Sequence, residues 1–583
     1  MIDRADDLVA QALSRPPIRV NQLGYLPDGP KTATWITDSD EPHVFRLESG
    51  GGRPSLTGRS RLVRGIDASS GFSVQLIDFS DLRDPGTYRV VVDGDPAAAS
   101  VPFDVCPDPY RGLFGDALRF FYAQRSGCEI REVILPGYQR PAGHVGIAPN
   151  QGDTAVPALR GPAAKHLYPG WVCPGRFDVS GGWYDAGDHG KYVVGGGISA
   201  ALLLAAHERL IRRHGFVEPD LTTEPAVLDE ALWEVDWMLR MQVPAGYPHA
   251  GMAFHRVHDS YWTEFPLAPH EDPAPRVLHR PSTAATLNLA AVASHAARLV
   301  ADSKPAYAAT LIAAAEQAHR AAIKQPDLFA PDDQGANGGG PYHDDRVEDE
   351  FYWAAAELFL TTGERRYLDA VSSSACHQED VFDVDGFDWD SVAAFARIEL
   401  ATVRSDLSDR SRIRASVIEA AERLVDVQAR QPWSQPYAPT NGWDWGSNGR
   451  ILNNLIVIAT AYDISRDARY LESALSGIDY VLGRNPVGLS FVTGYGADYS
   501  HRQRVRHFAH ALDPAYPPPP RGALAGGPAS KTYSGFPGDP RFEGLPPQLR
   551  YVDDPTAETT NDVCIRWNAS LVWLTLFLAT ASR

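Results

Sequence analysis

The stretch GSNGRILNNLIVIATAY, residues 446–462, carries apolar side chains at helical spacing. Ile451, Leu455, Ile458 and Tyr462 recur every three or four positions, so they share one face of a predicted α-helix that begins near Gly446. The same period recurs after residue 106, where helices are predicted to begin near Tyr110, Gly196, Ala226, Thr283, Pro305, Arg346, Arg365, Asp388, Ser408, Gly446, Ala468 and Asn561. This pattern predicts one large all-α domain over residues 107–583, and paired helices are consistent with a toroid of hairpins.

Residues 17–106 follow a different pattern. Short segments rich in Val, Phe and Tyr alternate with turn signals such as PDGP and DPG. The segments are IRVNQLGYL, KTATWITD, HVFRLES, FSVQLIDF, TYRVVVDG and VPFDV. Six or seven strands in this space predict a small β-sandwich of immunoglobulin type, preceded by an amino-terminal extension over residues 1–16.

The composition excludes several function classes. The chain has 583 residues, is 44% hydrophobic and carries a net charge of −19, which argues against nucleic acid or anionic membranes as partners. Five scattered cysteines without CxxC spacing indicate reduced thiols rather than a zinc site. MIDRADDLVAQALSRPP lacks the basic and apolar regions of a signal peptide, and no window looks apolar enough to span a bilayer. We therefore expect a cytoplasmic protein; its oligomeric state stays open.

The segment GGWYDAGDHGKY, residues 181–192, places Asp185 and Asp188 three positions apart on a glycine-rich loop. Gly182, Gly187 and Gly190 allow positive φ and close approach to a ligand. Two acids on such a loop can hold a metal or a water molecule. They can equally be a polar turn that caps a helix, and the spacing alone does not decide.

Two other loops concentrate polar and aromatic residues. TNGWDWGSN, residues 440–448, contains Trp443 and Trp445, whose flat faces suit a sugar ring or anchor the following helix. YVDDPTAETTNDVCIRWNAS, residues 551–570, contains Glu558 and Asp562 at the start of the last predicted helix. An acid there is either functional or simply stabilised by the helix macrodipole.

Together these loops supply the components of a glycoside hydrolase. Cleaving a glycosidic bond needs one proton donor for the leaving oxygen and one carboxylate that activates water or attacks the sugar. No Ser/His/Asp or Cys/His triad can be picked out, and GGGISA at residues 195–200 lacks the lysine of a phosphate loop.

The sequence resembles family 9 of the glycoside hydrolases, the inverting cellulases, in the subgroup with an amino-terminal immunoglobulin-like domain. IRVNQLGY, FYAQRSG, RPAGH, GGWYDAGDHGKYVV, PSTAATLNLAAVA, DEFYWAAAELFLTTGE, WGSN, LGRNPVGLSFVTGYG, LAGGP and YVDD…WNA occur in the family's order over nearly the whole chain. The resemblance implies an (α/α)₆ barrel. It also implies that Asp188 is the general base, that Asp185 helps to hold the attacking water, and that Asp562 occupies the position of the general acid.

The resemblance also suggests which residues bind substrate and metal. The expected sugar contacts are Trp183, Tyr184, His189, Trp443, Trp445, Arg504, Arg506 and His507. No cofactor is required, but a structural calcium ion fits the acids of YHDDRVEDE, which are Asp344, Asp345, Asp349 and Glu350.

The chain departs from the family where the chemistry matters. The family pattern has glutamate at position 562, an aromatic residue at 558 and a small residue at 564, whereas this chain has Asp562, Glu558 and Cys564. A shorter side chain withdraws the carboxyl by roughly 1.5 Å, and a misplacement of about 1 Å can cost on the order of a hundredfold in rate. Either Asp562 still reaches the substrate, Glu558 has replaced it, or hydrolysis is lost.

A second departure concerns a His-x-Arg pair of the family. Arg504 and Arg506 align there, with His501, His507 and His510 nearby. The main prediction is an inverting hydrolase of a soluble intracellular β-glycoside. The alternatives are a non-hydrolytic sugar-binding or scaffold protein and an enzyme of small-molecule biosynthesis.

Overall fold

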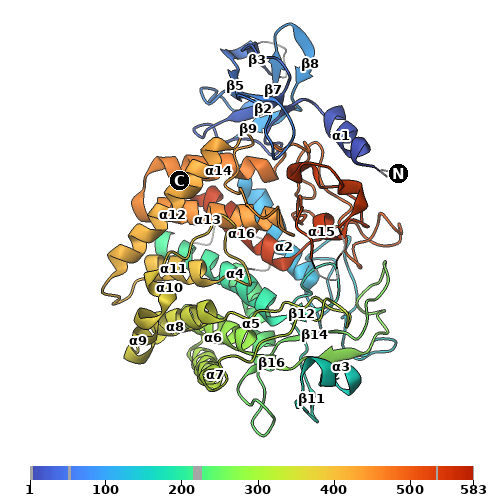
Figure 1. Ribbon diagram of the computed structural model, residues 1–583, viewed down its shortest axis with the longest axis vertical. Helices are drawn as coiled ribbons and strands as arrows, with labels where there is room; N and C mark the ends of the chain where they lie inside the picture. Colours follow the sequence, from blue (N-terminus) through green and yellow to red (C-terminus); the bar gives the residue numbers. More distant parts are fainter. Residues whose placement is uncertain (1–3, 50–53, 215–225, 534–535, 537, 582–583) are drawn as a thin grey trace.

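The structure is a computed structural model that describes residues 4–49, 54–214, 226–533, 536 and 538–581. Residues 18–105 form two antiparallel sheets packed face to face (Figure 1). The first sheet has the order β1-β2-β6-β5, with β1 Ile18–Arg19, β2 Thr32–Ile36, β5 Arg61–Leu62 and β6 Val74–Asp78. The second has the order β4-β3-β7-β8, with β9 also paired to β7. Its strands are β3 Val44–Ser49, β4 Pro54–Arg59, β7 Gly86–Val92, β8 Asp95–Ala99 and β9 Phe103–Val105.

The predicted β-sandwich is confirmed, and its core follows the alternation of the strands. Trp35, Phe45 and Val90 point inward from both sheets and are buried. The strands β4 and β8 were not predicted, because PSLTGR and DPAAA lack the alternation of apolar and polar residues that marks a half-buried strand.

The amino-terminal extension contains a helix. Helix α1, Ala5–Ser14, buries Leu8 against Phe542, Leu545 and Val552 of the carboxyl-terminal region. The sandwich itself lies against the helical domain near α14 (Figure 1), where Asn21 Nδ2 donates to Asp479 Oδ1 at 2.8 Å. Helix α1 therefore packs on the segment that precedes the last helix of the chain.

Twelve helices in the described part of the chain form six pairs, of which five are hairpins and the sixth joins α16 to α2. The inner members contact one another in the closed order α4, α6, α8, α11, α13, α16 and back to α4, and each packs on an outer helix. The inner helices are α4 Val193–His214, α6 Thr283–Val300, α8 Glu348–Thr362, α11 Ala393–Thr402, α13 Ser447–Ser465 and α16 Ile565–Ala581. The outer helices are α2 Tyr110–Gln124, α5 Val227–Arg240, α7 Pro305–Lys324, α9 Arg365–Ser373, α12 Arg410–Arg430 and α14 Ala468–Val481. This closed ring confirms the predicted (α/α)₆ barrel.

Short elements decorate the loops of the barrel. The helices are α3 Gly161–Leu167, α10 Ala375–Gln378 and α15 Glu558–Asn561, with 3₁₀ turns η1 Pro540–Phe542 and η2 Pro547–Leu549. The strands are β10 Val156–Pro157, β11 Arg176–Phe177, β12 Lys191–Tyr192, β13 Ala253–Phe254, β14 Arg256–Asp259, β15 Arg276–Leu278 and β16 Pro281–Ser282.

Two predicted helix starts moved because tertiary contacts occupy the residues before them. The helix expected at Asp388 begins at Ala393, since the carboxylate of Asp388 accepts a hydrogen bond from Arg566 of α16. The helix expected at Asn561 begins at Ile565, since Asp562 is extended and pairs with the segment at residue 504.

Helix α4 is unusually apolar. Among the described helices it alone contains a stretch, Val193–Arg212, long and apolar enough to cross a membrane, although the sequence analysis found no such window. In the structure 94% of that stretch is buried inside the protein, as expected for an inner helix of the barrel.

Candidate active site

The polar loops predicted from the sequence meet at one end of the barrel. Alternate helices of a hairpin ring run in the same direction, so the amino-terminal ends of the inner helices lie together. Asp185 and Asp188 precede α4, Asp344 precedes α8, Trp445 precedes α13 and Asp562 precedes α16. The ring therefore gathers residues nearly 400 positions apart, since Asp562 and Gly187 are separated by 375 positions and are hydrogen-bonded.

Backbone hydrogen bonds join the glycine-rich loop to the carboxyl-terminal segment. Gly187 N donates to Asp562 Oδ1 at 3.2 Å, and Gly187 O accepts from Arg506 N at 3.0 Å. Ile565 N, at the start of α16, donates to Asp185 O at 2.8 Å. The loop that carries the predicted base and the segment that carries the predicted acid therefore form one rigid unit.

Glycine is required at position 187 by close packing. A Cβ there would collide with the backbone oxygen of Arg504 and would lie 2.9 Å from Asp562 Oδ1. Positive φ, which the loop was expected to use, occurs at Gly182 with φ 74°. At Gly187 and Gly190 the missing side chain matters instead, because a Cβ at Gly190 would lie 2.6 Å from Asp188 Oδ2.

The two loop aspartates keep oxygens free for a ligand. Asp188 is partly exposed, and its Oδ2 accepts from Gly190 N at 3.1 Å and from Tyr192 OH at 3.0 Å. Asp185 is buried, and its Oδ2 accepts from Tyr342 OH at 2.5 Å. Asp185 Oδ1 has no hydrogen-bond partner among the described residues. Burial raises the pKa of Asp185 to about 6, against the opposing effects of Arg566 and Tyr342.

Asp562 lies in an environment that favours its protonated form. Burial raises the pKa of its carboxyl well above the ordinary value, Arg504 opposes this, and the charge of Asp188 adds to it. Its Oδ1 accepts from Gly187 N and, at 2.9 Å, from Val563 N. Because Oδ1 accepts both backbone N–H groups, a proton on this carboxyl would lie on Oδ2.

Glu558 is arranged differently. It opens the single turn α15, its side chain is 39% exposed, and its Oε1 is paired with Arg504 Nη2 at 3.3 Å. Donation of a proton from Glu558 would first require this ion pair to break. The geometry therefore favours Asp562 over Glu558 as the proton donor.

Four of the expected sugar contacts are buried and bonded to protein. Trp183 Nε1 donates to Glu230 Oε1 at 2.8 Å, and Tyr184 OH is hydrogen-bonded to His144 Nδ1 at 2.7 Å. His189 Nδ1 contacts Asp272 Oδ2 at 2.7 Å. His507 Nε2 contacts Gln124 Oε1 at 2.8 Å. These side chains hold the loop and present no surface to a sugar.

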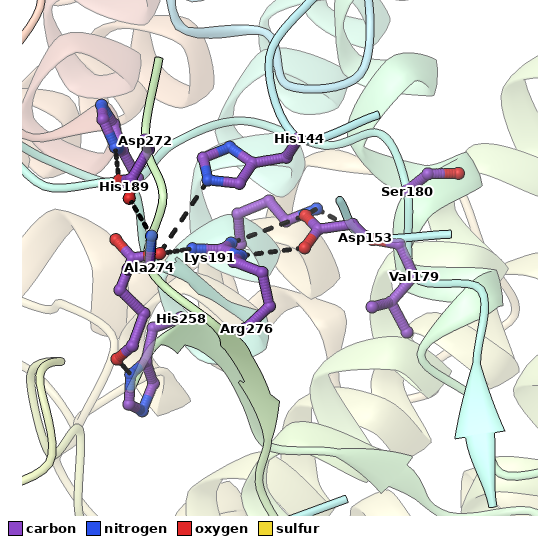
Figure 2. A network of polar contacts seen from close by, with 12 residues as sticks. His144, Asp153, Val179, Ser180, His189, Lys191, His258, Asp272, Ala274 and Arg276 are labelled. Atoms are coloured by element: carbon purple, nitrogen blue, oxygen red, sulfur yellow. Dashed lines mark hydrogen bonds and ion pairs between the residues drawn. The ribbon is translucent and has the colours of Figure 1, made fainter. Parts of the chain in front are cut away.

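Figure 2 shows the network behind His189. Lys191 Nζ and Arg276 Nε both bond the buried carboxylate of Asp153, at 2.7 and 2.9 Å. Lys191 also donates to the backbone oxygen of Gly181 at 2.7 Å, which closes the glycine-rich loop on itself. A buried ionic network of this kind fixes the loop that carries Asp188.

The two arginines expected to bind sugar are engaged by the protein. Arg506 is buried, and its guanidinium donates to Thr263 O at 2.7 Å and to Gly187 O at 3.2 Å. Arg504 is 27% exposed and pairs with Glu558. Both guanidinium groups stack on the ring of Phe265, at 4.3 and 4.4 Å. Arg506 therefore holds the glycine-rich loop through Gly187 O.

The two tryptophans of the loop at residues 440–448 have different roles. Trp443 is 4% exposed and packs on Tyr437 and Tyr480, so it anchors the start of α13. Trp445 is partly exposed and lies next to Tyr533, with ring centroids 5.9 Å apart. Of these two residues, only Trp445 offers an aromatic face.

The acids at the start of α8 carry the oxygen atoms that a hard cation prefers. Burial and the charge of Asp349 raise the pKa of Asp344 to about 7, and burial together with Asp349 and Asp344 raises the pKa of Glu350 well above its ordinary value. Asp344 Oδ2 and both carboxylate oxygens of Glu350 lack hydrogen-bond partners among the described residues. Oxygen ligands of this kind suit Ca²⁺. Asp345, also considered from the sequence, is exposed.

The sequence analysis missed several residues that contact the predicted catalytic acids. Tyr192 and Tyr342 donate to Asp188 and Asp185, and Arg566 lies beside Asp185 in the first turn of α16. A cation at the amino-terminal end of a helix opposes the macrodipole, which was the one signal available. The tyrosines had no such signal.

Comparisons with known proteins show which family this architecture belongs to. The model of glycosyl hydrolase family 9 matches residues 110–575, and that of the cellulase amino-terminal Ig-like domain matches residues 14–97. Endoglucanase C of Cellulomonas fimi is 47% identical over 97% of this chain and 52% of its own length. A cellulose 1,4-beta-cellobiosidase of Acetivibrio thermocellus is 37% identical over 98% of this chain and 68% of its own length.

A solved structure agrees with these matches. The Bacteroides ovatus GH9 structure aligns with a TM-score of 0.81 and 27% identity over 97% of this chain and 100% of its own. The chain belongs to glycosyl hydrolase family 9. It spans about half the length of endoglucanase C, 52%.

Proposed function

We propose that this protein is an inverting glycoside hydrolase that cleaves β-1,4-glucosidic or related β-glycosidic bonds. Family membership and the arrangement of Asp185, Asp188 and Asp562 support this reaction. The hydrogen bond between Gly187 N and Asp562 Oδ1 carries the proposal, because it holds a protonated carboxyl against the loop of the two water-binding aspartates.

Asp188 acts as the general base. Its Oδ2 is occupied by Gly190 N and Tyr192 OH, which leaves Oδ1 for the attacking water. The unpartnered Oδ1 of Asp185 accepts the second proton of the same water and orients it. As the water oxygen attacks the anomeric carbon, one proton passes to Asp188.

Asp562 acts as the general acid. Its raised pKa keeps the proton that the leaving oxygen needs. When the bond between the anomeric carbon and the glycosidic oxygen breaks, the Oδ2 proton passes to that oxygen. The reaction consumes one water and inverts the anomeric centre.

The substrate proposal follows the relatives and the aromatic surface. The two curated relatives are named an endoglucanase and a cellobiosidase, so a β-1,4-glucan or a short cello-oligosaccharide is the substrate of choice. Trp445 is the sugar-stacking residue in this proposal. A soluble substrate inside the cell stays a prediction from the sequence.

A calcium ion held by Asp344, Asp349 and Glu350 completes the proposal. Asp349 Oδ2 already accepts from Val392 N at 2.7 Å, which connects this cluster to the start of α11. When bound, the ion supplies charge neutralisation and takes no part in bond cleavage. The carboxylates would then fix the amino-terminal ends of two inner helices.

Turnover of cellotetraose by the wild-type protein, followed by reducing-end assay and by NMR of the anomeric proton, tests the proposal. Asp188→Asn should abolish turnover and leave cellotetraose binding measurable by calorimetry. Asp369→Asn, on the exposed outer helix α9, is the matched control and should be fully active. An active Asp188→Asn enzyme, or a product that retains its configuration, would contradict the assignment.

One observation favours a second function. Asp562 is one methylene shorter than the glutamate that the family pattern has, and its Oδ1 turns back to Val563 N. A sugar-binding protein on the same fold would bind cellotetraose without turnover in the same experiment.

A further inference from the structure

Arg566 is a buried cation at an unfavourable position. It is the second residue of α16 and only 8% exposed, so its charge lies at the positive end of the helix macrodipole. Its Nη1 donates to Asp388 Oδ2 at 2.5 Å, and Asp388 is 5% exposed. This ion pair offsets the cost of burying the guanidinium and holds it in place.

Contacts on three sides connect Arg566 to Asp185. The guanidinium carbon lies 5.6 Å from the ring centroid of Tyr342, whose OH donates to Asp185 Oδ2 at 2.5 Å. A Cβ on Gly195 would lie 2.6 Å from Asp185 Oδ1 and 3.7 Å from Arg566 Cδ. Ile565 N donates to Asp185 O. The carboxylate, the phenol and the guanidinium are therefore contiguous.

Both side chains keep polar capacity unused. Asp185 Oδ1 and Arg566 Nε are buried without hydrogen-bond partners in the described part of the chain. The pair with Asp388 occupies one nitrogen of the guanidinium. A guanidinium with an unpartnered nitrogen near a carboxylate with an unpartnered oxygen acts on that carboxylate strongly in a low-dielectric region.

We propose that Arg566 is a positioning residue that keeps Asp185 ionised, so that Asp185 accepts a hydrogen bond from the attacking water instead of donating one to it. This inference rests on the proposed function, because it assigns Asp185 the water-holding role. An ionised carboxylate only accepts hydrogen bonds, whereas a protonated one donates and would turn the water away from the anomeric carbon.

The other charges around Asp185 show why a cation is needed. Titratable groups face it from the glycine-rich loop, α5, the loops before α8 and α11, and the segment before α16. They are Asp188, Tyr192, Glu234, Tyr342, Asp388 and Cys564. Burial, Asp188 and Asp388 raise the pKa of Asp185, whereas Arg566 and the Tyr342 hydroxyl lower it. Arg566 therefore supplies the positive charge that opposes these acids.

The pH dependence of kcat/KM on cellotetraose tests the inference with three variants. Asp185 must be ionised for turnover, so its pKa contributes to the acidic limb of the profile. Arg566→Met should move that limb up by about one pH unit or more, because an opposite charge at short range typically shifts a carboxyl pKa by about 1–3. Arg566→Lys keeps the positive charge, so its acidic limb should lie close to that of the wild type.

Asp388→Asn should shift the acidic limb in the opposite direction. It removes a negative charge near Asp185 and the counterion of Arg566, so the acidic limb should move down. A residue with a merely structural role would lower activity at every pH and leave the limb in place. Coincident limbs for wild type and Arg566→Met, or the same direction of shift in both variants, would overturn the inference.

A direct titration separates this inference from the proposed function. The ¹³C carboxyl signal of Asp185, assigned by its absence in Asp185→Asn, reports ionisation without turnover. If the wild type is inactive but Arg566→Met raises the pKa of Asp185 in this titration, the hydrolase proposal fails and the role of Arg566 in ionisation stands. If the enzyme turns over and the titration is unmoved, the role of Arg566 fails. Should Arg566→Met not fold, Arg566→Lys and Asp388→Asn decide the question.

Discussion

Asp562→Asn should remove the proton donor while leaving its surroundings in place. The amide oxygen can still accept from Gly187 N and Val563 N, which lie 3.2 and 2.9 Å from Asp562 Oδ1. The amide NH₂ then replaces the carboxyl OH at Oδ2 and has no acidic proton. General acid catalysis contributes about 10²–10⁴-fold to a rate. The activation barrier should therefore rise by about 2.7–5.4 kcal/mol, since each tenfold change in rate is about 1.36 kcal/mol.

The size of the loss should depend on the leaving group. Cellotetraose releases a sugar hydroxyl that must be protonated, so kcat/KM should fall by the full factor. A dinitrophenyl β-cellobioside releases a stable phenolate, so its hydrolysis should be almost unaffected by the substitution. The assay compares initial rates of both substrates for the wild type and the variant at one pH.

Glu558→Gln is the matched control for this prediction. Its carboxylate is paired with Arg504 and is not the proton donor, so the variant should lose little on either substrate. The reasoning would be refuted if Asp562→Asn slowed both substrates equally. It would also be refuted if Glu558→Gln, and not Asp562→Asn, showed the dependence on the leaving group.

Two further predictions concern stability. Calcium at about 100 times its Kd should stabilise the wild type by about 2.7 kcal/mol and raise its Tm, and Glu350→Gln should lose this response in thermal melts; an equal response in both would exclude the site. His295, buried between Glu208 and Glu357, has a raised pKa because these and Glu399 outweigh the burial that would lower it. The stabilising contribution of His295 to the free energy of unfolding is therefore complete below the ordinary histidine pKa of about 6.5. This contribution is lost as the pH rises through the raised pKa of the folded state. His295→Gln should cost about 3–5 kcal/mol at low pH and less at alkaline pH; a Tm difference independent of pH would contradict this.

Periodicity in the sequence was sufficient to find the helices of the barrel. Helices α2, α6, α7, α9 and α14 begin at the predicted residues, because a buried face repeats every 3.6 positions whatever the partner is. The starts of α11 and α16 moved by several residues. There Asp388 and Asp562 form contacts with distant segments, which no local pattern encodes.

The candidate acids could be named from the sequence, but the roles of their neighbours could not. Trp183, Tyr184, His189 and His507 lie on the loops around the candidate acids and are buried. A loop has no period, so the sequence does not reveal which side of it faces the core. The tertiary structure alone decided that these residues hold the loop.

The sequence by itself determined the fold class, the order of the domains and the identity of Asp185, Asp188 and Asp562 as candidate acids, since composition, period and motif are local properties. Only the tertiary structure decided that Asp562 lies against Gly187, that Glu558 is paired with Arg504, and that a buried arginine stands beside Asp185. The physical reason is the ring of helices, which brings the amino-terminal ends of α4, α11 and α16 together. Burial and charge at that end arise from segments that are far apart along the chain.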